Sequence, residues 1–207
     1  MYLNYFLAAL LGYFFGAFPT GYIAGRMIGH VDVREMGSGR TGGTNVLRSA
    51  GRNAAIVTIV GDIAKGALAV IVARLIWDGD PMAAALAAIF SVIGHNYSVF
   101  LKFKGGAGTM TAAGALLALH PVVLVLAALI PLIMTYITMM TSIGSLLGSA
   151  IGLLLGVVLA WNGDIPWESL IFFVPFFLLS WYSHRPNLAR LRAGNERRIG
   201  DKAKAPS

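Results

Sequence analysis

The sequence contains no cysteine and few charged residues. Without cysteine, the chain forms no disulfide, no thiolate metal site and no thiol nucleophile. Asp, Glu, Lys and Arg together make up 12% of the 207 residues, about half the share found in soluble domains. Apolar residues make up 57%, and the mean hydropathy is +0.73. This composition excludes a disordered chain and indicates a protein that crosses a membrane several times.

Acidic residues are scarce relative to basic ones. The chain has 9 Asp and Glu against 16 Lys and Arg, which gives a net charge of +7 and a pI near 10.0. In a soluble protein, this excess would indicate a nucleic-acid partner. In a membrane protein, the enrichment of Lys and Arg in cytoplasmic loops explains the same excess. We therefore expect the lipid bilayer and anionic ligands as partners, and no nucleic acid.

Common catalytic signatures are also missing. The sequence has no H-E-x-x-H motif and no cluster of His, Asp and Glu with metal-ligand spacing. It has no G-x-S-x-G motif and no convincing Ser-His-Asp arrangement. We predict no metal and no other cofactor. An enzyme built from these residues would act by positioning two substrates and stabilising charge.

Long apolar runs dominate the rest of the chain. They cover residues 3–28, 54–77, 82–101, 107–119, 121–140, 142–161 and 167–182. Six of them are close to the roughly 20 residues that span a bilayer, whereas the fourth reaches only about 20 Å as a helix. The predicted fold is an all-α polytopic membrane protein with seven transmembrane helices, the fourth short.

The basic residues predict the orientation. The end of the first run with the segment after it, the segment after the third run and the C-terminal tail together hold 14 of the 16 Lys and Arg. The positive-inside rule places these segments in the cytoplasm, with the N-terminus outside. We expect residues 1–183 to form an integral membrane domain and residues 184–207 a cytoplasmic basic tail whose first part completes the active site. The last ten residues or so are expected to be disordered.

The first polar segment is glycine-rich. Residues 37–45 contain the pattern G-x-G-x-x-G, but no strand precedes it and no Gly-Lys-Ser/Thr closes it, so neither a Rossmann fingerprint nor a P-loop fits. Glycines let backbone N–H groups approach an anion, and hydroxyls, amides and guanidiniums add donors. The candidate anion-binding residues here are Gly37, Ser38, Gly39, Arg40, Thr41, Gly42, Thr44, Asn45 and Arg48. The alternative is a flexible loop between two spans.

The second polar segment covers residues 94–109. Its glycines are expected to open the short fourth helix, and helix N-termini bind anions. The candidates are His95, Lys104, Gly105 and Gly106. The alternatives are a lysine that anchors the chain at the membrane edge and a packed histidine with a structural partner.

The third polar segment begins the tail. His184 and Asn187 are three residues apart, which would place them on one helix face, although Pro186 argues against a continuous helix. Within the apolar runs, Asp62 and Lys65 are also three apart and are expected to pair, as a functional site or as a structural ion pair. Ser142 and its neighbour Thr141 place hydroxyls at the cytoplasmic end of a span. The alternative role of these hydroxyls is to satisfy helix-end backbone groups.

These segments resemble the PlsY family of bacterial acyl-phosphate:glycerol-3-phosphate acyltransferases. Residues 37–45 resemble its G-S-G-N-x-G-A-T-N loop, residues 94–109 its G-H-x-x-P/S-V-F…F-K-G-G-K-G segment and residues 184–196 its H-x-x-N-I-x-R-L…G-x-E tail. Asp62 and Lys65 match a D-x-x-K-G pattern. The resemblance implies acyl transfer from acyl phosphate to the sn-1 hydroxyl of glycerol 3-phosphate. The product is lysophosphatidic acid for phospholipid synthesis, made at the cytoplasmic side of the bacterial inner membrane.

The resemblance also implies roles for particular residues. Glycerol 3-phosphate would be held by Ser38, Arg48, His184 and Asn187, of which Ser38, His184 and Asn187 would be catalytic. The donor phosphate would be held by Thr44, Lys104 and Ser142. The sequence departs from the family pattern at three positions. This chain has Arg40 where the family has Asn, Gly43 where it has Ala, and Ala107 where it has the lysine of G-G-K-G. Because one cation is lost and one gained, Arg40 is expected to substitute for the missing lysine.

Two rival interpretations remain open. One is a relative within the family that has changed its donor or lost activity. The other is a small anion or lipid transporter, although the polar residues gather at one rim and no internal repeat of the transporter type is present.

Overall fold

The computed structural model describes residues 1–203, and every regular element within them is a helix. The α-helices are α1 (Tyr2–Ala17), α2 (Thr20–Met27), α3 (Gly43–Ile76), α4 (Pro81–Asn96), α5 (Thr109–Leu119), α6 (Pro121–Thr138), α7 (Thr141–Trp161), α8 (Leu170–Ser183) and α9 (Arg185–Arg192). Short 3-10 turns lie at η1 (Val33–Glu35), η2 (Val99–Leu101) and η3 (Trp167–Ser169). The all-α prediction is confirmed.

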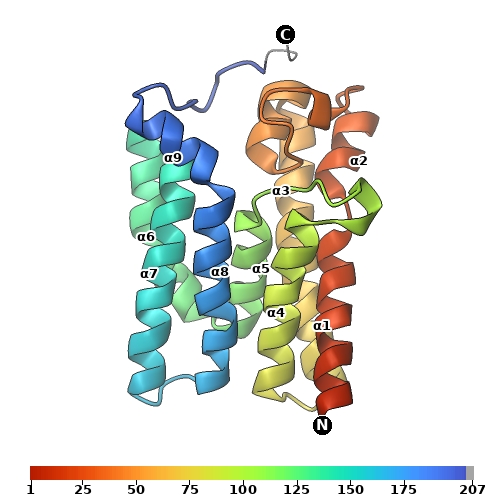
Figure 1. Cartoon of the computed structure of the whole chain (residues 1–207), viewed down its shortest axis with the longest axis vertical. Helices are drawn as coiled ribbons and strands as arrows, with labels where there is room; N and C mark the ends of the chain where they lie inside the picture. The colour runs from red at the N-terminus through yellow and green to blue at the C-terminus, as the bar shows by residue number, and fades with distance from the viewer. Residues whose placement is uncertain (204–207) are drawn as a thin grey trace.

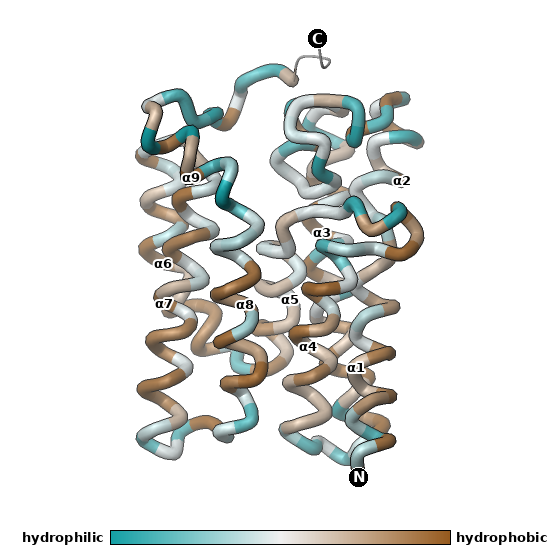
Figure 2. Tube along the Cα trace, in the orientation of Figure 1, coloured by the Kyte–Doolittle hydropathy of each residue, from teal (hydrophilic) through white to brown (hydrophobic). Residues whose placement is uncertain are grey.

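The predicted spans correspond to helical stretches of unequal length. By length and composition, 5 stretches within residues 1–203 are able to cross a membrane: Tyr2–Met27, Gly43–Ile76, Pro81–Leu101, Pro121–Thr138 and Thr141–Trp161. The fourth run is short, as expected, because it forms only α5. The seventh run, Trp167–Ser183, is also below the length of a full span. Apolar colour runs along the shafts of the helices, and polar colour gathers in the segments at their ends (Figure 2).

The helices form an upright bundle with two sides. In Figure 1, α1, α3 and α4 stand on one side, α6, α7 and α8 on the other, and the short α5 lies between them. Met1 lies at one end of the bundle, and α9 with the described tail lies at the opposite end. Because the two ends lie at opposite ends of the bundle, the chain runs along it an odd number of times.

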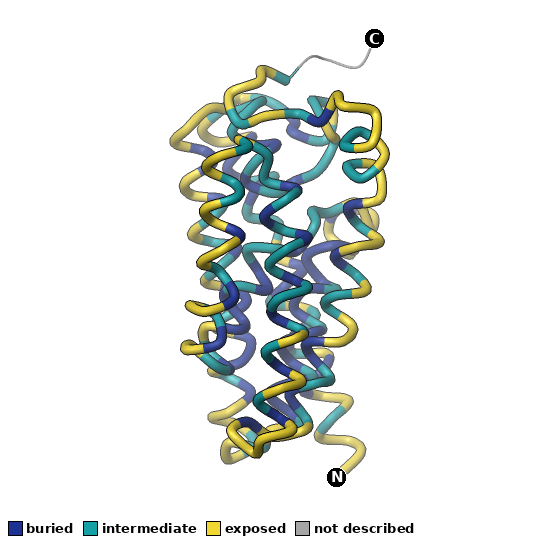
Figure 3. The backbone as a smooth tube through the Cα atoms, turned by 90° about the vertical axis from the view of Figure 1, so that its left-hand side faces the viewer, coloured by how far each residue is buried: buried dark blue, intermediate teal, exposed yellow. Residues whose placement is uncertain are grey.

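Glycines allow α1 and α4 to pack closely. A Cβ added at Gly16 would lie 1.8 Å from the backbone oxygen of Ser91, and one added at Gly94 would lie 2.1 Å from that of Tyr13. Small residues at such crossings let two backbones approach and gain van der Waals contact. Buried residues face the interior of the bundle, and exposed ones face outward (Figure 3).

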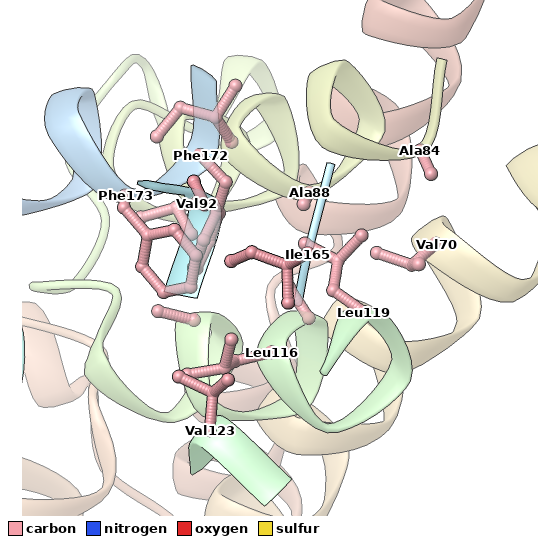
Figure 4. Close-up of a cluster of buried hydrophobic side chains, with 14 residues drawn as sticks. Val70, Ala84, Ala88, Val92, Leu116, Leu119, Val123, Ile165, Phe172 and Phe173 are labelled. Carbon is pink, nitrogen blue, oxygen red and sulfur yellow. The ribbon is translucent and has the colours of Figure 1, made fainter. Parts of the chain in front are cut away.

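The main apolar core joins α4, α5 and α8. Val92, Leu116, Phe172 and Phe173 belong to one buried cluster, and the two phenylalanine rings meet edge to face with centroids 5.4 Å apart (Figure 4). This cluster fixes the short α5 between its longer neighbours. The position of α5 matters because the residues just before it face the candidate site.

Two helix boundaries differ from the sequence-based expectation. The apolar pattern predicts a helix from residue 54, but α3 begins at Gly43 and continues through a kink at Gly51, where φ is +85°. A polar helical turn therefore precedes the apolar run, and Arg48 lies on a helix and not in the expected loop. The chain is not one continuous helix around Pro186, as expected, because α8 ends at Ser183 and α9 begins at Arg185. Pro186 is nevertheless helical, because a proline in the first turn of α9 needs no N–H partner.

The tail after α9 packs against the bundle. The Ile199 N–H donates to the Met139 carbonyl at 2.6 Å, and the Ala203 N–H donates to the Arg48 carbonyl at 3.2 Å. The expectation of a disordered end is therefore wrong for residues 198–203. Residues 204–207, which it also covered, lie outside the described residues.

Candidate active site

A cavity of about 520 Å³ lies within the bundle toward the end that carries α9 and the tail. Its polar lining includes Ser38, Arg40, Thr44, Arg48, Thr109, Thr141, Ser142, Ser145, His184, Asn187, Arg190, Glu196 and Arg197. Its apolar lining includes Ile59, Met110, Ala113, Leu116, Leu124, Ala127, Pro131, Leu132 and Phe176. One cavity thus offers a polar surface and an apolar surface to its contents.

The cavity gathers most of the residues predicted for the site. Those that line it are Gly37, Ser38, Arg40, Gly42, Thr44, Asn45, Arg48, His95, Ser142, His184 and Asn187. Those outside its lining are Gly39, Thr41, Lys104, Gly105 and Gly106. Lys104 is exposed, whereas Thr41 is buried and its N–H donates to the Gly105 carbonyl at 3.4 Å. The two glycine segments therefore meet beside the cavity.

Asn45 folds the first glycine segment. Its Nδ2 donates to the carbonyls of Val33, Met36 and Arg40 at 2.8 to 3.1 Å, and its Oδ1 accepts from the Ser38 N–H at 2.9 Å. With its amide engaged in this way, Asn45 shapes the loop that carries Ser38 and Arg40. The predicted role in direct phosphate binding fits Asn45 less well than this scaffolding role.

His184 lies at the junction of α8 and α9 and is buried. Its Nδ1 lies 2.8 Å from the Ser180 carbonyl oxygen. A carbonyl only accepts, so Nδ1 carries the hydrogen and Nε2 keeps a free lone pair. Burial lowers the pKa of His184 from its ordinary 6.5, and nearby Arg40 lowers it further, against the hydrogen bond to Ser180. The imidazole is therefore neutral near pH 7 and able to accept a proton.

Glu196 connects three parts of the site. Its Oε1 accepts from the Ser142 hydroxyl at 3.1 Å and from Asn187 Nδ2 at 2.7 Å, and its Oε2 accepts from Arg190 Nε at 2.9 Å. It is only 8% exposed. The sequence analysis gave it no role, although an acidic residue in a strongly basic tail is a signal that it has a specific partner.

Basic groups outnumber acidic ones around the polar surface. Arg40, Arg48, Arg190 and Arg197 line it, whereas Glu196 is engaged by its three donors. The Arg40 guanidinium donates to the Ser183 carbonyl, and burial together with nearby Arg190 and Arg185 lowers the pKa of Arg40. Such a surface attracts anions, because an anion would relieve the repulsion between these cations.

The charged pair inside the bundle supports the second glycine segment. Lys65 Nζ lies 2.9 Å from Asp62 Oδ1, which confirms the predicted pairing, and His95 Nδ1 lies 3.4 Å from the same oxygen. Thr20 also donates to Asp62. The ring of His95 packs against the glycine segment, since a Cβ at Gly106 would lie 2.1 Å from His95 Nε2.

The second glycine segment uses part of its own backbone. The Gly105 N–H donates to the Asn96 carbonyl and the Gly106 N–H to the His95 carbonyl, each at 3.1 Å. These two N–H groups are therefore engaged within the chain. The residues that follow, from Ala107 to the start of α5, line the cavity in their place.

Paired hydroxyl groups complete the polar surface, and two of them, Thr109 and Ser145, have no assignment in the sequence analysis. Thr109 donates to Ser145 at 3.0 Å, and Thr44 donates to Thr141 at 3.3 Å. These pairs connect α5 and α3 to α7 across the cavity. No group of three or more His, Cys, Asp and Glu that would hold a metal ion occurs within residues 1–203.

The fold and the cavity define a class: a helical membrane protein with one internal site that is basic on its polar side and apolar elsewhere. The family model described as glycerol-3-phosphate acyltransferase matches residues 6–194, so the chain belongs to that family. It is 42% identical to the glycerol-3-phosphate acyltransferase of Thermus thermophilus over 95% of this chain and 96% of the relative. It is 41% identical to that of Synechococcus elongatus over 98% of each.

Solved structures match the fold as well. The crystal structure of PlsY (YgiH), an integral membrane glycerol 3-phosphate acyltransferase, superposes in its glycerol 3-phosphate form with a TM-score of 0.85 and 29% identity. The match covers 95% of this chain and 96% of that one. Its lysophosphatidic acid form gives a TM-score of 0.83 at 28% identity, with 95% of each chain covered. The resemblance stated from the sequence motifs is thereby confirmed.

Proposed function

We propose that this member of the family transfers a fatty acyl group from acyl phosphate to the sn-1 hydroxyl of glycerol 3-phosphate. The product is lysophosphatidic acid, and inorganic phosphate leaves. The observation that carries the proposal is that one cavity combines a basic polar side, which suits two phosphates, with an apolar side, which suits an acyl chain. Solved structures of a similar protein in glycerol 3-phosphate and lysophosphatidic acid forms support this choice.

His184 is the proposed proton acceptor. The sn-1 hydroxyl is a weak nucleophile, and its oxygen attacks the acyl carbonyl carbon more readily as its proton moves to the free lone pair of Nε2. The new C–O ester bond forms as the bond from the carbonyl carbon to the phosphate oxygen breaks. Phosphate is a good leaving group, so no covalent acyl-enzyme is required.

The remaining side chains hold the two substrates. Ser38, Arg48 and Asn187 are proposed to bind glycerol 3-phosphate, and the contact with Glu196 fixes the Asn187 amide. Thr44, Ser142 and Arg40, which line the same cavity, are proposed to bind the donor phosphate. Lys104, also predicted for the donor, is exposed outside the cavity lining, and we assign it no direct contact in this conformation.

The proposed location is the bacterial inner membrane. The N-terminus is proposed to lie outside, and the tail and the active site in the cytoplasm, as the distribution of Lys and Arg predicts. Reporter fusions at both ends of the chain test this orientation. An active cytoplasmic reporter is expected at the C-terminus only, and reporters active on the same side at both ends would contradict the odd number of crossings.

A choice of donors tests the reaction. The purified protein is given glycerol 3-phosphate together with acyl phosphate, acyl-coenzyme A or acyl-carrier-protein thioester at equal concentration. We expect lysophosphatidic acid from acyl phosphate alone. Product from a thioester alone would identify a relative with a changed donor, and no product from any donor would support loss of activity or a transport function.

A further inference from the structure

The segment after Glu196 crosses the site and contacts both sides of it. At one end, the Ile199 N–H donates to the Met139 carbonyl in the connection between α6 and α7, at 2.6 Å. Farther along, the Ala203 N–H donates to the Arg48 carbonyl on α3, at 3.2 Å. In Figure 1, the tail runs from α9 across the end of the bundle toward α3. We call residues 198–203 the strap, and they lie beyond residues 6–194 matched by the family model.

The strap holds the side chain of Arg48. Arg48 Nη2 donates to the Arg198 carbonyl at 3.0 Å. The Asp201 N–H donates to the same carbonyl at 3.3 Å, and the Arg198 N–H donates to Asp201 Oδ2 at 2.7 Å, which together close a turn. Arg48 Nε is buried and has no hydrogen-bond partner. The guanidinium is thus fixed at one nitrogen, and Arg48 lines the cavity without an ion-pair partner among residues 1–203.

A partly buried guanidinium without a counterion is costly, so its presence in the lining of a cavity points to an anion as its partner. We propose that the strap positions Arg48 to bind the phosphate of glycerol 3-phosphate, an inference that depends on the role proposed above for Arg48. A long, flexible side chain loses conformational freedom when it binds a ligand. A side chain that is already held loses less, and the ligand binds more tightly. The strap residues are positioning residues and touch no reacting atom.

The inference predicts a selective effect on one Michaelis constant. Ile199→Pro removes the N–H that anchors the strap and restricts the backbone of Arg198, whereas the matched control Ile199→Ala keeps that N–H. One lost hydrogen bond of ordinary strength corresponds to roughly three- to tenfold. We expect Ile199→Pro to raise the KM for glycerol 3-phosphate by about this factor, with kcat and the KM for the acyl donor within about twofold. Ile199→Ala is expected to match the wild type.

A second variant removes the strap altogether. Truncation after Arg197 deletes the strap but keeps Glu196 and its three contacts, so the thermal unfolding midpoint is expected to stay close to that of the wild type. The same rise in the KM for glycerol 3-phosphate is expected. An unchanged KM in both variants overturns the inference, and so does an equal fall in kcat with every substrate, which a merely structural role would cause.

Combination with Arg48→Ala separates this inference from the proposed function. If the strap acts through Arg48, its removal adds no further rise in KM once Arg48 is alanine. If the two changes raise the KM independently in the double variant, so that their factors multiply, the inference about the strap is overturned and the role of Arg48 is kept. An Arg48→Ala variant with an unchanged KM for glycerol 3-phosphate overturns the role of Arg48 and the strap together, while an active wild type still upholds the acyltransferase reaction.

Discussion

Removal of the His184 imidazole tests the proposed proton transfer. In His184→Ala, the sn-1 hydroxyl loses its proton acceptor, and general-base catalysis typically contributes a factor of about 10²–10⁴. We therefore expect kcat to fall by at least about 100-fold. The KM for the acyl donor is expected to change little, because no donor contact is assigned to His184. Initial rates of lysophosphatidic acid formation by the purified variant measure the effect.

The pH dependence of the wild type tests the same role in a second way. Only the neutral imidazole accepts a proton, so kcat/KM is expected to fall as pH falls through the pKa of His184. Burial lowers that pKa from its ordinary 6.5, so this acidic limb is expected below pH 6.5. His184→Ala is expected to lose the limb together with most of its rate.

The control is a histidine outside the site. His30 is exposed and has a φ of +55°, a conformation that asparagine tolerates, so His30→Asn removes an imidazole with little backbone strain. It is expected to keep the rate and the pH profile of the wild type. A folded His184→Ala variant with near-normal turnover, or a wild-type acidic limb above pH 6.5, would refute the reasoning.

Three other predictions concern charged residues, two in the cavity lining and one outside it. Arg40→Asn is expected to lower kcat/KM roughly 10–150-fold, the value of a hydrogen bond to a charged group, and adding Ala107→Lys is expected to restore much of it; independent, additive effects would reject the compensation. Glu196→Ala leaves Asn187 and two other donors without their acceptor, so the free energy of unfolding is expected to fall by about 1.5–3 kcal/mol. Scanning calorimetry measures this change, and an unchanged unfolding midpoint would contradict the connecting role of Glu196. The hydrogen bond from Arg34 lowers the pKa of Asp32 from 3.8 to about 2, so its stabilising contribution is complete above pH 3.8 and disappears as pH falls toward 2. The difference in unfolding midpoint between wild type and Asp32→Asn should shrink over that interval, and a difference independent of pH would show that the charge of Asp32 is not the cause.

The positions of the apolar helices could be predicted because the hydropathy of a segment depends only on its own residues. Each of the seven apolar runs corresponds to helix, and the short fourth run is α5. Boundaries at polar residues were less predictable. The extension of α3 to Gly43 depends on a glycine with positive φ at Gly51 and on packing against the loop that Asn45 folds. Neither produces an apolar period in the sequence.

The site was predicted in part. Motifs placed Ser38, His184 and Asn187 together, and all three line one cavity. The network of Glu196 and the contact between the strap and Arg48 were not predicted, because they join residues far apart in the chain through contacts without a local sequence pattern. Composition indicated only a disordered basic end, although backbone hydrogen bonds hold that end through residue 203.

The central claim is direct transfer between two substrates held in one cavity. The most direct measurement follows the release of inorganic phosphate from acyl phosphate by the purified protein on a fast time scale, first without and then with glycerol 3-phosphate. Direct transfer predicts no burst of phosphate without glycerol 3-phosphate. In its presence, one phosphate should appear for each lysophosphatidic acid. A burst equal to the enzyme concentration, accompanied by acylated protein, would contradict direct transfer.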